Sequence, residues 1–254
     1  RAWKAVHGTL PGKLTIFLEG EEESGSPSLI PFLKANAPEL SADVALICDT
    51  GMFEGRTPAV TTMLRGLLGE ELTIHAANRD LHSGMYGGLA QNPIHILTRI
   101  LSRLHDAEGR VAIEGFYDQV KPLADWERQA ASESPLTDAD IAREAGVDEL
   151  AGESGYSGME RIGARPTAEI NGLGGGYQGE GTKTVIPSKA FAKISCRLVP
   201  NQRPERIKKL VMDTIRARVP KGIRLEFVDQ HQGDPYVVVP PGRSNTPPDQ
   251  SPVL

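Results

Sequence analysis

The stretch KLTIFLEGEEESGSP, residues 13–27, joins a β-prone apolar run to four glutamates in five positions. A second such run, DVALIC at residues 43–48, ends at Asp49, and residues 29–33 between the runs have the apolar spacing of a helix. This order predicts a βαβ unit with two parallel strands. Because open α/β sheets bind ligands at the carboxyl ends of their strands, we expect the glutamates and Asp49 to share one edge.

The acidic segment EGEEE, residues 19–23, is the strongest local signal of chemistry. Carboxylates crowded at one sheet edge repel one another, so the folded state needs solvent or a cation between them. Two interpretations stay open: a solvated acidic loop, or a metal site. Successive side chains of an extended segment point opposite ways, so one of Glu22 and Glu23 can ligate a metal while the other holds a proton near bound water.

From about residue 61 the pattern predicts an α+β layer, with a helix pair on one face of a small antiparallel sheet. Strands are expected over residues 61–75, 184–186, 191–199 and 223–228, and helices from Asn92-Pro93 and from Pro204. Residues 115–165 are charged and unpatterned, which favours an insertion with short helices. The glycine-rich residues 172–181 precede a strand rather than open a helix, so their GxGxxG match predicts no dinucleotide site.

Two residues of this second part are candidates for function. His82 lies in the turn-forming stretch NRDLHSGMYGG, residues 78–88, and loops of this kind often carry function, whereas the other five histidines are expected to be packing or surface residues. Arg197 shares one strand face with Lys193 and Ser195. It is either a sheet or salt-bridge residue, or a rigid fork for a substrate carboxylate.

Composition narrows the classes of protein. The 254 residues carry a formal net charge of −5, which argues against a general nucleic-acid binder, and no apolar run reaches the length of a membrane span. Two cysteines favour a reducing compartment, so we expect a cytoplasmic protein. The chain begins with Arg1, which suggests a processed chain or an excerpt.

Five motifs in register carry a resemblance to a known family. FLEGEEESGS, ALICDT, NRDLHSGMYGG, GEGTKTVIP and ISCRLVPN, in this order, resemble the metallopeptidase family of carnosine dipeptidases, acetylornithine deacetylase and succinyl-diaminopimelate desuccinylase, and its dipeptidase branch most closely. The resemblance implies an α/β catalytic domain holding two metals, with an inserted lid or dimerisation domain. By this resemblance, residues 1–60 belong to the catalytic domain, residues 61–232 form the lid, and residues 233–254 start the return to the catalytic domain.

The resemblance also implies roles for six residues. Glu22 resembles the general base, while Glu23 and Asp49 each resemble a ligand of one of two Zn²⁺ ions, for which Mn²⁺ could substitute. His82 resembles a lid histidine that reaches the partner's active site and stabilises the oxyanion. Thr184 resembles a second lid contact to the substrate, and Arg197 the clamp on the substrate's terminal carboxylate.

The chain departs from the family pattern at its flanks. The family's metal site needs a histidine and a bridging aspartate upstream of the EGEEE segment and a histidine near the carboxyl end, and these are absent from the 254 residues. We therefore expect an excerpt that is inactive alone, from a homodimeric, zinc-dependent dipeptidase that binds neither nucleic acid nor membranes. The alternatives are a non-catalytic dimerisation or binding module, and an N-acyl amino acid deacylase.

Overall fold

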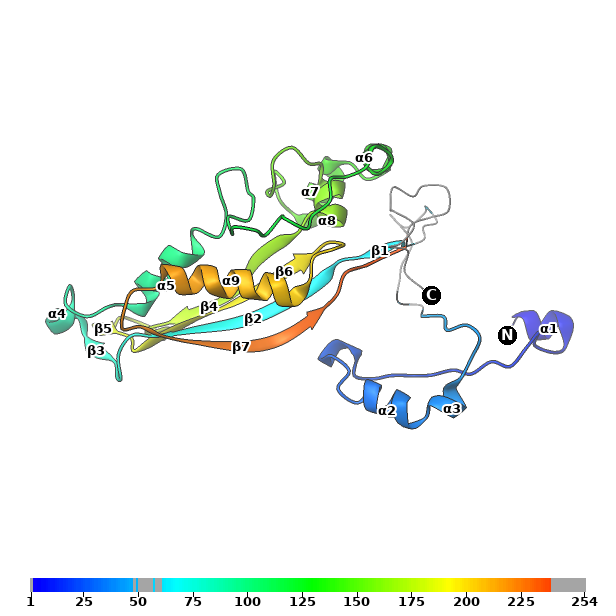
Figure 1. Cartoon of the computed structure of the whole chain (residues 1–254), viewed down its shortest axis with the longest axis horizontal. Helices are drawn as coiled ribbons and strands as arrows, with labels where there is room; N and C mark the ends of the chain where they lie inside the picture. The colour runs from blue at the N-terminus through cyan, green and yellow to red at the C-terminus, as the bar shows by residue number, and fades with distance from the viewer. Residues whose placement is uncertain (1, 48, 50–56, 58–60, 239–254) are drawn as a thin grey trace. The chain divides into compact units, whose positions relative to one another are not determined.

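A computed structural model describes residues 2–47, 49, 57 and 61–238 of the chain. It divides into two units, Arg1–Gly51 and Met52–Leu254, which are treated separately below (Figure 1). The mixed α/β class predicted from the sequence is confirmed, although the two units differ sharply in how much of their surface they bury.

The first unit is helical where the sequence predicts a helix, but its described residues form none of the predicted strands. Its elements are α1 (Ala2–His7), the 3-10 helix η1 (Glu22–Ser24), α2 (Leu29–Ala35) and α3 (Ala37–Leu40). Residues 13–18 and 43–47 pair with no strand, so the expected parallel βαβ pair is not formed among the described residues; Cys48 lies outside them.

The reason for this failed prediction is a lack of sheet and core. A strand needs a hydrogen-bonded neighbour, and none is available in the described part of the first unit. Apolar side chains that a sheet would cover are open instead, for example Leu18 at 87% and Ile47 at 87% exposure. None of the described residues of this unit is buried.

The second unit is built on a four-stranded antiparallel sheet in the order β4-β6-β2-β7 (Figure 1). Its strands are β2 (Gly66–His75), β4 (Thr167–Gly175), β6 (Lys189–Leu198) and β7 (Arg224–Gly233). Two short pairs extend it: β1 (Met63–Leu64) with β8 (Tyr236–Val237), and β3 (Leu81–His82) with β5 (Val185–Ile186).

Helices α5 (Pro93–Leu101) and α9 (Pro204–Arg218) cover one face of this sheet, as predicted. Alternate residues of β6 are buried and exposed, so the strand sends Ile194, Cys196 and Leu198 into the core and leaves Arg197 outside. Cys196 is a buried free thiol, and its burial, followed by the charges of nearby glutamates, raises its pKa to about 12.

The segment that the sequence leaves unpatterned contains three short helices, as expected: α6 (Asp125–Ser132), α7 (Asp138–Ala145) and α8 (Gly158–Ala164). Helices α7 and α8 each begin at a side-chain cap. In α7 the Thr137 hydroxyl accepts from the Asp140 amide, and the Asp140 carboxylate accepts from the Thr137 amide.

Strand β4 is the main element that the sequence did not predict, because glycines dilute its apolar pattern. At Gly174 an added Cβ would lie 2.4 Å from Phe191 Cε1 on the neighbouring strand β6. Glycine is therefore needed here for close approach of a cross-strand ring. No helix in the described part of the chain is long and apolar enough to cross a membrane.

Candidate functional site

His82 and Thr184, which lie 102 residues apart in the sequence, meet at one end of the sheet. Strand β3 ends at His82 and pairs with β5, which begins directly after Thr184. His82 is also the residue that precedes α4 (Ser83–Tyr86). Its Nε2 lies 3.2 Å from the Thr184 hydroxyl, and its Nδ1 accepts a hydrogen bond of 3.0 Å from the Gly84 amide.

A second connection holds the same end of the sheet together. Asp80 Oδ1 accepts from both the amide and the hydroxyl of Ser188, each at 2.8 Å. These bonds, the one from the backbone amide first, lower the pKa of Asp80 below its usual range. The sequence contained no signal for this pairing, because it depends on the turn between β5 and β6.

Arg197 lies near the opposite end of the sheet. It stands on the exposed face of β6, across from Leu67 of β2 and Thr167 of β4, whereas the other end of β6 starts at Lys189, across from His75. At about 3.3 Å per strand residue, Arg197 is roughly 25 Å from that end. The structure therefore brings His82 and Thr184 together but keeps Arg197 apart from them.

Arg197 has a cationic neighbour that the sequence analysis missed. Burial, and then the charge of Arg197, lower the pKa of the half-buried Arg65. Neither guanidinium forms an ion pair with a carboxylate in the described ranges, whereas Lys193 on the same face lies 3.7 Å from Glu71. This end of the sheet therefore has positive charge free to bind an anion.

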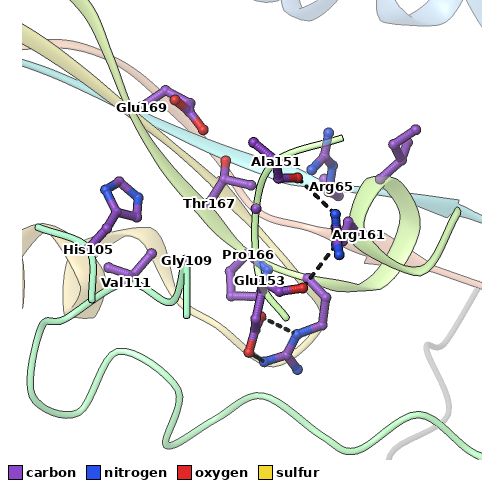
Figure 2. Close-up of a pocket in the computed structure, with 13 residues that line it drawn as sticks. Arg65, His105, Gly109, Val111, Ala151, Glu153, Arg161, Pro166, Thr167 and Glu169 are labelled. Carbon is purple, nitrogen blue, oxygen red and sulfur yellow. Dashed lines mark hydrogen bonds and ion pairs between the residues drawn. The ribbon is translucent and has the colours of Figure 1, made fainter. Parts of the chain in front are cut away.

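A cavity of about 420 Å³ opens beside Arg65 (Figure 2). Most of the charge around it is already compensated. Arg165 forms two bonds of 2.7 Å with Glu153, and Arg161 donates to the carbonyls of Glu153 and Ala151, between which Figure 2 draws it. We interpret this network as support for the start of β4 and for α8.

The three predicted metal-site residues lie in the first unit. Glu22 and Glu23 belong to η1, where successive side chains are turned by roughly 120° rather than pointing opposite ways as in the predicted extended segment. Both are exposed, as is Asp49. Glu21 has a structural role instead, because its carboxylate accepts hydrogen bonds from the Ser28 amide and hydroxyl at the start of α2.

These carboxylates do not form a metal centre by themselves. No three His, Cys, Asp or Glu side chains gather as a group that could hold an ion anywhere in residues 2–47, 49, 57 or 61–238. A structural Zn²⁺ site takes four ligands, and a catalytic site three with an open position. The described donors therefore do not fit a complete centre.

The antiparallel sheet with two helices on one face gives the second unit an α+β fold. Residues 62–223 match the family described as the peptidase dimerisation domain. The chain belongs to this M20 peptidase family.

Several known proteins that are similar to this chain have metallopeptidase or dipeptidase names. It is 31% identical over 245 residues to the Cys-Gly metallodipeptidase dug1 of Schizosaccharomyces pombe, covering 94% of this chain and 51% of that protein. Human carnosine dipeptidase 1 superposes with a TM-score of 0.78 at 25% identity, covering 94% of this chain and 51% of that one. An M20 metallo-carboxypeptidase of Sulfolobus solfataricus superposes with a TM-score of 0.72 at 34% identity, covering 85% and 49%.

The chain spans about half the length of curated relatives that it matches. The names of dug1 and of human carnosine dipeptidase 1 confirm the resemblance to the family of carnosine dipeptidases drawn from the sequence motifs.

Proposed function

We propose that the whole protein is a metal-dependent dipeptidase that acts as a homodimer. Its substrate is a small peptide with a free terminal carboxylate. The dipeptidase names of the relatives support this class of reaction. We also propose that residues 1–60 belong to the catalytic domain, 61–232 to the lid and 233–254 to the return. A cytoplasmic location and the absence of nucleic-acid or membrane partners stay predictions.

The observation that carries the proposal is the distance between the two ends of the sheet. His82 and Thr184 lie beyond one end of β6, and Arg197 is roughly 25 Å from that end. An extended dipeptide spans only about 7 Å. One substrate therefore cannot contact all three side chains of the same chain. If all three serve one substrate, His82 and Thr184 come from one subunit and Arg197 from its partner.

Arg197 is proposed to bind the substrate carboxylate. A planar guanidinium on a rigid strand suits bidentate binding of a carboxylate, and no acidic partner occupies it in the described chain. The neighbouring Arg65 also favours binding of an anion, since a negative charge between two adjacent cations stabilises both of them.

The remaining roles are assigned to His82, to Thr184 and to three carboxylates of the first unit. His82 is proposed to donate from Nε2 to the developing oxyanion, with Thr184 beside it as a second substrate contact. Glu22 is proposed to accept the proton of the attacking water and deliver it to the leaving amine. Glu23 and Asp49 are proposed to contribute one carboxylate each to a site for two Zn²⁺ ions, or Mn²⁺, with other ligands supplied elsewhere in the whole protein.

The proposed base is tested in the whole protein with a Glu22→Gln variant. Its matched control is Glu39→Gln in α3, a second exposed glutamate of the same unit. Loss of the base should lower kcat for dipeptide hydrolysis by about 100-fold or more, while the control stays within about twofold. A Glu22→Gln rate within about tenfold of the unmodified protein would refute this role.

Sharing of sites between subunits is tested by mixing two inactive variants, His82→Ala and Arg197→Ala. In a mixed dimer one site lacks both groups and the other keeps both. Random pairing should therefore restore about a quarter of the unmodified activity. Mixtures as inactive as either variant alone would mean that the three residues do not serve a site shared between chains.

A second candidate function is a dimerisation module without catalysis. The failure of the described carboxylates to gather favours it. Sedimentation and zinc titration of this chain distinguish the two: a dimer without tight zinc supports the module for this chain alone, whereas two zinc ions per chain exclude it. An N-acyl amino acid deacylase is the third candidate, because such substrates also end in a carboxylate that Arg197 could hold; comparing both substrate types in the whole protein decides.

A further inference from the structure

The hydrogen bond at His82 Nδ1 has a defined direction. A backbone N–H can only donate, so the 3.0 Å contact from the Gly84 amide requires a lone pair on Nδ1. A neutral imidazole has one protonated nitrogen, which must then be Nε2. The Nε2–H group consequently faces the Thr184 hydroxyl at 3.2 Å and acts as its donor.

Glycine at position 84 is needed for this contact. A Cβ there would lie 2.9 Å from His82 Cε1 and 3.2 Å from Nδ1, so any other residue would displace the ring. The backbone itself does not require glycine, because Gly84 has no positive φ. An alanine would therefore fit the main chain of α4 and disturb only the imidazole.

The partner of Nε2 is fixed by the rest of the network. The Ser83 amide donates to the Thr184 carbonyl at 3.0 Å, and β3 pairs with β5 directly beside it. Asp80, two residues before His82, holds Ser188, four residues after Thr184, by two bonds of 2.8 Å. Both strands that carry the pair are thus tied together on each side.

We propose that Gly84 and Asp80 are positioning residues, which hold His82 as the Nε2–H tautomer with its donor aimed beside Thr184. The proposal rests on the dipeptidase function given above, in which this donor stabilises the oxyanion. In this proposal neither Gly84 nor Asp80 touches the substrate. Each acts only by holding the His82 ring in place.

The first test is independent of activity. Long-range ¹H–¹⁵N correlation spectra of this chain, at a pH where His82 is neutral, identify which ring nitrogen carries the proton, and a His82→Asn variant assigns the signals. We expect Nε2–H in the unmodified chain and a mixture of tautomers in Gly84→Ala. Gly163→Ala in α8 is the matched control, since an added Cβ meets nothing within 4 Å there.

The second test uses the whole protein. Gly84→Ala should lower kcat at least about tenfold with KM nearly unchanged, because an oxyanion donor acts mainly in the transition state. If Gly84→Ala does not fold, Asp80→Ala serves instead and is expected to lower kcat in the same way. Asp80→Asn keeps an acceptor oxygen and is expected to recover part of the kcat lost in Asp80→Ala. Gly163→Ala should have no effect.

The two proposals fail in different ways. An Nδ1–H tautomer in the unmodified chain, or a Gly84→Ala variant with unchanged tautomer and unchanged kcat, would overturn the positioning role. A whole protein that hydrolyses no dipeptide, or hydrolyses it equally well as His82→Ala, would overturn the proposed function, and the spectra would then decide the positioning of His82 alone.

Discussion

Arg165 is a buried cation that three neighbours compensate. Its guanidinium binds Glu153 through two bonds of 2.7 Å and lies 4.3 Å from the ring centroid of Tyr156 and 5.1 Å from that of Tyr117. Both charges of the pair are less than a tenth exposed. Such a pair adds little stability over an apolar pair, but either charge left alone in the interior is costly.

Glu153→Gln should therefore destabilise the second unit by roughly 3 kcal/mol, because it leaves Arg165 buried without a counter-charge. Urea unfolding monitored by circular dichroism measures the change. The control is Asp118→Asn, which breaks an exposed pair with Arg206 and should cost less than about 1 kcal/mol. Equal effects of the two substitutions would show that burial of the pair does not matter.

Individual residues were predictable only where the local sequence carries the signal. His82 could be chosen because glycines and polar residues surround it, and Arg197 because it alternates with apolar neighbours along a strand. The Glu153–Arg165 pair and Arg65 could not be chosen, since their environments are created by segments that meet only in the folded chain. The same holds for Asp80, whose partner Ser188 lies 108 residues away.

Among the elements, α9 is fastened to the sheet by charge as well as by apolar contacts. Lys208 Nζ lies 3.3 Å from the buried Glu70 of β2 and also pairs with Asp229 of β7. Burial raises the pKa of Glu70, and the charge of Lys208 opposes this rise. A carboxyl group whose pKa is raised on folding stabilises the folded state at pH values below its usual pKa. This stabilisation is lost as the pH rises through the pKa of the folded state.

Lys208→Met should destabilise the protein at neutral pH by about 2 kcal/mol, since it leaves the Glu70 carboxylate without its cation. The loss should shrink as the pH is lowered and Glu70 becomes protonated, and adding Glu70→Gln should abolish this pH dependence. Thermal unfolding at several pH values measures both effects. Lys209→Met, whose partner Asp213 is exposed, is the control and should change stability by less than about 1 kcal/mol.

Helix α7 provides a pH test of the opposite sign. Hydrogen bonds from the side chain and then the backbone of Thr137 lower the pKa of Asp140 to about 2. Because its pKa is lowered on folding, Asp140 stabilises the folded state at pH values above its usual pKa of 3.8. This stabilisation is lost as the pH falls towards about 2. The protection of the α7 amides relative to their intrinsic exchange rates should therefore fall over this interval in the unmodified chain but not in Asp140→Asn. Identical profiles would argue against the cap.

Elements with a clear period were predicted well. The spacing of Ile94, Leu97 and Ile100 predicts α5, and the alternation along residues 191–199 predicts β6. Strand β4 was missed because its glycines admit the Phe191 ring and so erase the pattern. The strands at residues 13–18 and 43–47 were predicted wrongly because local propensity cannot supply a pairing partner.

For the molecule as a whole, the two units should differ in local stability. The central strands of the second unit bury residues such as Leu72 and Ile194, whereas no described residue of the first unit is buried. Opening free energy follows buried apolar area and protected hydrogen bonds.

Hydrogen exchange followed by mass spectrometry should therefore label peptides over residues 13–18 within the earliest time points. Peptides from the middle of β2 and β6 should exchange only through near-global unfolding. A peptide over residues 91–101 serves as an internal reference for a helix packed on the sheet. Slow exchange at residues 13–18 would mean that this segment is covered in solution, contrary to the prediction.

The Cys196 sulfur, on the core face near the end of β6, offers a practical consequence. A thiol with a pKa of about 12, closed off from solvent, reacts negligibly with alkylating reagents while the sheet is intact. After Cys48→Ser, Cys196 would be the sole cysteine of the chain. Its rate of modification would then report how readily the sheet opens, without any added probe.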